Sequence, residues 1–157
     1  MTANPAAQSQ SEPGPEHKRL GALVGRWHTT GRTSPTLSDP GVEIDAIDTY
    51  EWLPGGFGLL HVVDARVGDE RVDGAEVIGH DASRGTYITL YVGSDGPTSY
   101  EARLTEQDGG LVWSMRSASN RFTGVFNEER TTIAGHWELL GDDGRWVPWM
   151  EITLTKS

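Results

Sequence analysis

Turn-forming residues interrupt this chain at short intervals from residue 38 onward. Nine clusters rich in Gly, Asp, Asn, Ser and Pro separate ten stretches in which apolar and polar residues alternate. Such alternation predicts strands, and the connections are too short for crossover helices. We therefore predict an all-β fold of about ten antiparallel strands in a meander. The predicted strands span residues 25–33, 42–53, 57–66, 71–79, 86–92, 98–104, 111–116, 121–127, 131–139 and 146–155.

The N-terminal region has a different character. Residues 1–15 contain no large apolar residue after Met1 and are expected to form a disordered tail. Leu20, Leu23 and Val24 then fall at helical spacing between Pro15 and Gly25, which predicts a short helix. Residues 16–157 are thus expected to form one β-barrel domain.

Ten antiparallel strands that close into a barrel enclose more space than their own side chains easily fill. A ligand cavity is the favoured interpretation, and a fully packed core is the alternative. In most strands one face is clearly apolar, but the facing of residues 71–79 and 86–92 is ambiguous. In the latter, Tyr87, Thr89 and Tyr91 compete with Ile88, Leu90 and Val92 for the interior.

Charge and composition exclude several classes of function. The net charge of −10 and only 13 scattered basic residues argue against binding to nucleic acid or to an anionic membrane. The chain has no cysteine, no zincin-like His spacing, no phosphate-binding Gly-rich loop and no nucleophile elbow. No signal peptide or apolar membrane span is apparent, so a cytoplasmic location is expected.

A Gly-x-Trp sequence, Gly25 to Trp27, follows the predicted helix and resembles the opening of calycin barrels. These include lipocalins, fatty-acid-binding proteins and nitrobindin-like proteins, and ten strands suit the latter two. The chain is also similar to a bacterial lipocalin-like family with three features in order. They are Leu20 to Trp27, then Gly79 and Asp81 followed by Tyr87, and finally Asp143 to Trp146.

This resemblance implies a small-molecule-binding barrel in which Trp27 is structural, closing one end and stacking on a basic side chain. Nitrobindin-like barrels also bind haem through a histidine near the C-terminal end. Here the last histidine is His136, and residues 146–157 contain none. We therefore expect no cofactor, haem included, and no metal.

One pair of residues has the character of a functional site. If Pro54 and Gly55 form a tight connection, Asp48 lies directly opposite His61 on the inward face. The carboxylate could orient the imidazole as a general base or as a polar anchor for a ligand. The alternatives are a buried pair that only fills a polar gap, or a different register.

Aromatic and apolar side chains of the inward faces supply the rest of the predicted site. Tyrosines could direct hydroxyls at a bound polar group, although such tyrosines often only pack. His28 and His136 are expected on the exterior, and His80 in a turn. The predicted ligand-binding residues are Tyr50, Trp52, Leu59, His61, Tyr87, Tyr100, Trp113, Met115, Phe122 and Trp137.

The preferred function is binding of an apolar or aromatic small molecule by a monomer or homodimer. The alternative is a natural-product cyclase or isomerase in which His61 and Asp48 act as an acid–base pair. A third possibility is an interaction domain with a filled core.

Overall fold

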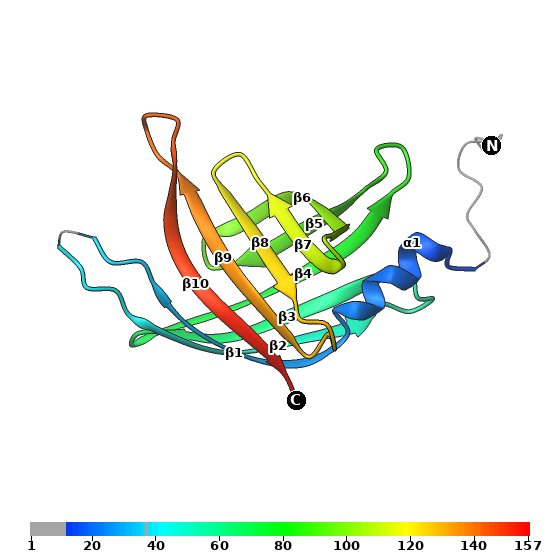
Figure 1. The fold of residues 1–157 in the computed structure, drawn as a ribbon, viewed down its shortest axis with the longest axis horizontal. Coiled ribbons are helices and arrows are strands. Elements are labelled where there is room, and N and C mark those ends of the chain that lie inside the picture. The colour runs from blue at the N-terminus through cyan, green and yellow to red at the C-terminus, as the bar shows by residue number, and fades with distance from the viewer. Residues whose placement is uncertain (1–11, 37) are drawn as a thin grey trace.

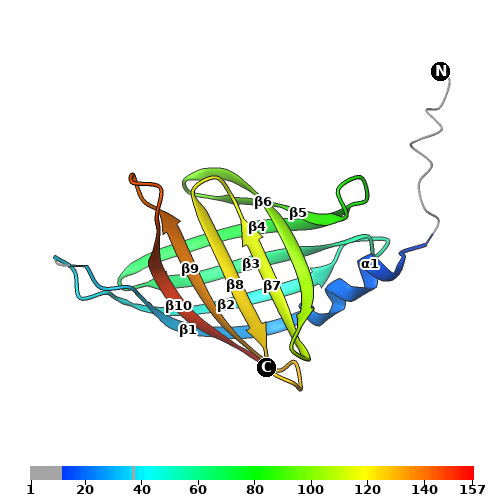
Figure 2. The ribbon, with the colours of Figure 1, turned by 45° about the horizontal axis from the view of Figure 1, so that its top comes forward.

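A computed structural model describes residues 12–36 and 38–157, which form a closed barrel of ten antiparallel strands (Figures 1 and 2). Each strand pairs with its neighbours in sequence, and β1 closes the barrel by pairing with β10. The predicted fold is confirmed. The strands are β1 (Gly25–Thr33), β2 (Glu43–Trp52), β3 (Gly58–Val67), β4 (Glu70–Asp81), β5 (Thr86–Gly93), β6 (Gly96–Gln107), β7 (Gly110–Arg116), β8 (Asn120–Phe126), β9 (Thr132–Leu140) and β10 (Trp146–Lys156).

The predicted helix is present as two short pieces, α1 (Pro15–Lys18) and the 3-10 helix η2 (Arg19–Ala22). They lie across one end of the barrel (Figure 2), where the Tyr87 hydroxyl donates to the carbonyl of Glu16 at 2.6 Å. Neither piece has the length or apolar content to cross a membrane. Most of the expected disordered tail, residues 1–11, lies outside the described residues.

Trp27 packs at the helical end of the barrel. Its side chain is 0% exposed, and its Nε1 donates to the carbonyl of Leu23 at 2.8 Å. The ammonium group of Lys156 lies 4.9 Å from the centre of the indole ring, where a cation–π interaction is favourable. Trp27 in β1 therefore contacts both the helical segment and β10, the last strand.

The interior is packed differently at its two ends. Near η2, side chains such as Leu20, Leu59 and Ile78 are 0% exposed. Farther from η2, the inward rings of Tyr91 and Trp137 are only half-buried. The facing of β5 is now clear, because Thr89 is buried while its neighbour Leu90 is exposed.

The β2–β3 connection corrects one sequence prediction. Tyr50, and not Asp48, pairs with His61, and Asp48 pairs with Val63. The loop spans residues 53–57 and contains two glycines with positive φ, so it is longer than a tight turn at Pro54 and Gly55. Since the register differs by two residues, the same side chains still face inward.

We expect Trp27→Ala to lower the free energy of unfolding by about 3–5 kcal/mol, because it removes a fully buried aromatic side chain. Trp52→Ala is the matched control, since Trp52 is 40% exposed, and should cost about 1 kcal/mol. Urea unfolding measures both values. Equal losses in the two variants would contradict the role assigned to Trp27.

Candidate functional site

Five polar side chains, one from each of the strands β1–β5, form a continuous hydrogen-bonded chain inside the barrel. All five are buried, with exposed fractions of 9% or less. They reach the interior because each lies on the inward face of its alternating strand. We call this group the His61 network, and its members are Thr29, Asp48, His61, Glu76 and Thr89.

His61 lies at the centre of the network, between two carboxylates. Its Nε2 is 2.6 Å from Oδ1 of Asp48, and its Nδ1 is 3.0 Å from Oε1 of Glu76. The second oxygen of each carboxylate accepts from a threonine hydroxyl, Thr29 on Asp48 and Thr89 on Glu76 at 2.9 Å. Every carboxylate oxygen in this buried group therefore has a donor.

The surroundings of His61 favour its charged form. Burial by itself would lower the pKa of His61, but hydrogen bonds to Asp48 and Glu76 and their negative charges outweigh it. Together they raise the pKa of His61 from 6.5 to about 9. The Tyr50 ring stacks on the imidazole at a centroid distance of 4.0 Å. Burial raises the pKa of Tyr50 well above 10, and the same two carboxylates add to the effect.

The network separates bulky from small side chains along the first four strands. Toward η2, the next inward residues are all large and buried, namely Trp27, Tyr50, Leu59 and Ile78. In the opposite direction, the next inward positions carry small side chains or none, namely Gly31, Ala46, Val63 and Gly74. The strands themselves therefore contribute less bulk on the side of the network that faces away from η2, where the backbone of Glu151 lies against Gly31 and the Tyr91 side chain lies over Gly74.

The opposite wall of this region is aromatic. The Trp137 ring lies 5.1 Å from that of Phe122, 5.9 Å from that of Tyr100 and 5.8 Å from that of Trp149. On β5, Tyr91 is directly opposite Glu76, and its hydroxyl lies over Gly74, where a Cβ would be 2.2 Å from it. Aromatic rings thus border the carboxylates of the network.

The structure brings together most of the residues predicted from the sequence. Asp48 and His61 are in contact, although diagonally rather than as a direct pair. The other predicted residues that border the network or the aromatic wall are Tyr50, Tyr100, Met115, Phe122 and Trp137. His28 and His136 lie on the exterior, as expected.

Four predicted residues lie elsewhere. Trp52 is 40% exposed at the end of β2 and lies near Gly21 of η2, so it does not line the lumen. The Tyr87 hydroxyl is engaged by the Glu16 carbonyl, and the Tyr87 ring is 5.9 Å from that of Trp113. Trp113 and Leu59 belong to the packed core near the helical end.

Sequence reasoning missed Glu76, Thr29 and Thr89. A carboxylate and two hydroxyls on apolar faces have no periodic signature of their own. The one available signal was that Glu76 and Ile78, two residues apart, lie on the same face of a strand. This signal was obscured because the sequence of residues 71–79 does not show which face points inward.

The His61 imidazole is not arranged as an axial ligand of haem. An axial ligand needs a histidine nitrogen with a free lone pair. His61 is the histidine within the network, and both of its ring nitrogens are hydrogen-bonded to carboxylates. His28 and His136 are exposed on the outer wall.

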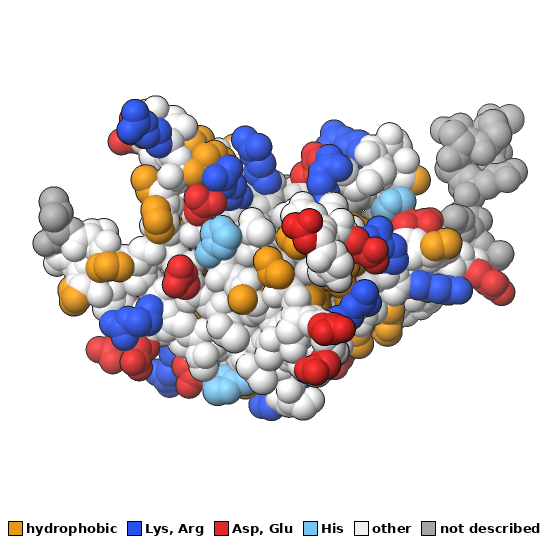
Figure 3. Space-filling view, in the orientation of Figure 1, with side chains coloured by type: hydrophobic (Ala, Val, Ile, Leu, Met, Phe, Trp, Pro, Cys, Tyr) orange, Lys and Arg blue, Asp and Glu red, His pale blue; other side chains and the backbone are white. Residues whose placement is uncertain are grey.

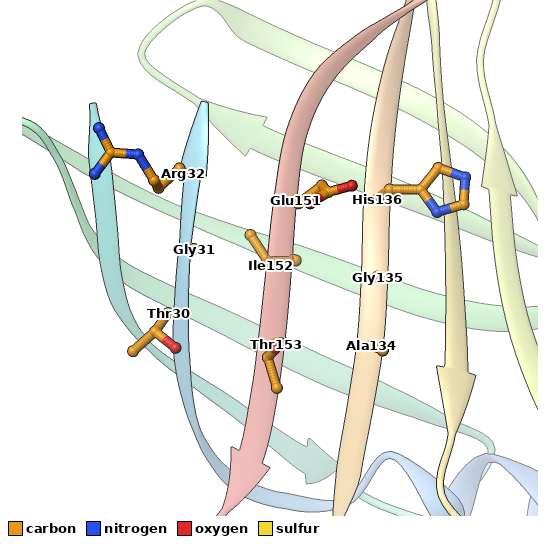
Figure 4. A pocket seen from close by; sticks show the side chains of 9 residues that line it. All are labelled: Thr30, Gly31, Arg32, Ala134, Gly135, His136, Glu151, Ile152 and Thr153. Carbon is orange, nitrogen blue, oxygen red and sulfur yellow. The ribbon is translucent and has the colours of Figure 1, made fainter. Parts of the chain in front are cut away.

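Two hollows lie apart from the His61 network. One, of about 510 Å³, is an open depression on the outer wall over β1, β9 and β10 (Figure 4). The exposed side chains of Arg32, His136 and Glu151 line it. The other, of about 240 Å³, lies between α1 and the ends of β5 and β6.

On the face in Figure 3, basic and acidic side chains are interspersed, without one extended basic patch.

The raised pKa of His61 predicts how stability depends on pH. Its contribution is fully present below about pH 6.5 and is lost as pH rises through about 9, because the folded protein binds the proton more tightly. We expect the free energy of unfolding to fall by on the order of 3 kcal/mol across this range.

Urea unfolding at several pH values measures this decline. His61→Gln should abolish it and also lower the stability by about 3–5 kcal/mol at neutral pH, since two buried carboxylates lose their partner. His28→Gln is the control, because His28 forms a similar 2.6 Å contact with Asp45 on the exposed outer face. A decline that survives His61→Gln would contradict the assignment.

Several solved structures share this fold, among them two that are similar over most of their length. The crystal structure of Rv2717c from M. tuberculosis has a TM-score of 0.73 at 9% identity, covering 93% of this chain and 99% of that one. The S-type phycobiliprotein lyase CPES from Guillardia theta has a TM-score of 0.58 at 11% identity, covering 90% of this chain and 92% of that one. No curated protein matches the sequence. Residues 12–156 match the family described as "Protein of unknown function (DUF1579)", and the chain therefore belongs to that family.

Proposed function

We propose that this protein binds a small molecule with an apolar or aromatic body inside its barrel, as calycin-type barrels do. The observation that carries the proposal is the asymmetry of the interior. The helical end is packed around fully buried side chains, whereas inward aromatic rings farther along the lumen remain half-buried. Half-buried aromatic rings beside a few fixed polar groups are typical of ligand sites.

The structural similarity to the phycobiliprotein lyase also supports the proposal that the barrel binds a small molecule. That protein is a phycobiliprotein lyase, and it shares the fold of this chain over most of both lengths. At 11% identity this likeness concerns the fold, so the size and shape of the ligand must come from the residues of this chain.

The geometry of His61 favours binding over acid–base catalysis. A general base needs a free lone pair within reach of the substrate. Both nitrogens of His61 are bonded to carboxylates, and the pKa of about 9 keeps the ring protonated at neutral pH. We therefore assign His61 and Asp48 to ligand positioning, and the cyclase or isomerase remains the less favoured alternative.

The neutral fluorescent dye Nile red tests the proposal. We expect it to bind with a blue-shifted emission, and Trp137→Ala should weaken its affinity at least about tenfold, because this ring is the centre of the aromatic wall. Trp146→Ala is the matched control. The Trp146 ring packs against the Arg121 guanidinium at 4.3 Å, and Arg121 pairs with Glu138 on the outer side of the barrel.

Fluorescence titration gives the affinities, and thermal unfolding shows whether each variant is folded. A wild-type protein that binds neither Nile red nor a charged dye of similar size would contradict the proposed function. Equal loss of affinity in both tryptophan variants would place the dye outside the lumen.

A further inference from the structure

The hydrogen-bond geometry of the His61 network determines its net charge. A carboxylate accepts hydrogen bonds, so each of the two contacts between His61 and a carboxylate requires one proton. Asp48, His61 and Glu76 with two shared protons carry a net charge of −1. This total is the same whether both protons belong to the imidazole or one belongs to a carboxyl group.

Nothing else buried among the described residues offsets this charge. Besides the network, the polar side chains that are buried there are His17 and Thr86. His17 lies in α1, where its Nδ1 accepts from the backbone N–H of Gly14 at 2.9 Å. Lys156 lies over Trp27 at the closed end. An uncompensated buried charge is costly, and a ligand of opposite charge would reduce that cost.

Two of the ionisable members of the network are slightly more exposed than the third. The side chains of His61 and Asp48 each retain 11% exposure, compared with 4% for Glu76. Small inward residues lie on the side away from η2, as described above. A polar group entering from that side reaches the Asp48 carboxylate, which can accept further hydrogen bonds.

The aromatic wall favours the same ligand chemistry. Tyr91 is paired with Glu76 across β4 and β5, and Thr89, which donates to Glu76, is paired with Tyr100 across β5 and β6. A cation placed beside the carboxylates would therefore also lie near the aromatic rings of Tyr91 and Tyr100. Cations are attracted to aromatic faces within about 6 Å.

We propose that the lumen selects an organic cation, a molecule with an apolar or aromatic body and one positively charged nitrogen directed at Asp48 and Glu76. This inference rests on the proposed binding function and adds the charge of the ligand to it. Anionic molecules of the same size are disfavoured, because they would meet a buried negative charge.

Three dyes of different charge test the inference: cationic thioflavin T, neutral Nile red and anionic 8-anilinonaphthalene-1-sulfonate. We expect thioflavin T to bind at least about tenfold more tightly than the anionic dye. The preference should persist in about 0.5 M NaCl, because salt screens buried charges much less than the surface charge of this acidic protein.

Asp48→Asn should remove most of the preference, since it removes one charge from the network. Asp45→Asn is the matched control. It removes the same formal charge from the same strand, but Asp45 is exposed on the outer face beside His28. If Asp48→Asn does not fold, the wild-type preference in high salt decides the question.

The outcomes separate the two proposals. Binding of Nile red without a preference for the cation would overturn the present inference and leave the binding function intact. The inference would also be overturned if the preference for the cationic dye disappeared in high salt, or if it fell equally in Asp48→Asn and Asp45→Asn. Failure of all three dyes to bind would overturn the binding function itself.

Discussion

The interior of this barrel depends on one imidazole that is shared by two buried carboxylates. Without His61, Asp48 and Glu76 would place two negative charges in a region from which most water is excluded, at a cost of several kcal/mol. With it, all four carboxylate oxygens receive a hydrogen bond. The arrangement links five neighbouring strands through their side chains, in addition to the backbone ladder.

This network also marks where the barrel changes character. On one side, Trp27 and the helical segment seal a densely packed end. On the other, small residues such as Ala46 and Gly74 are the next inward residues of their strands, and the inward ring of Trp137 on β9 is half-buried. A packed end stabilises the fold, while a loosely covered polar group with aromatic neighbours suits recognition. The packed end and the proposed ligand site lie at different levels of the same strands, because every second residue along each strand faces inward.

Most of the fold was predictable because strand alternation and turn residues are local properties. The ten strands and the short helix follow from such signals, whereas the structural role of Trp27 was implied by the family resemblance. The Asp48–His61 contact was predicted with a register wrong by two residues, and the error left the faces unchanged because side chains repeat every second residue. Glu76 was missed because its position beside His61 depends on the facing of β4, which its sequence leaves ambiguous.

The protonation of His61 is the most direct test of this account. Nuclear magnetic resonance of the ¹⁵N-labelled imidazole, read through its ring ¹⁵N and ¹H shifts, reports whether each nitrogen carries a hydrogen. We expect both nitrogens of His61 to be protonated at neutral pH and the ring to titrate near pH 9. A neutral imidazole at neutral pH, titrating at or below its usual 6.5, would contradict the shared-imidazolium arrangement.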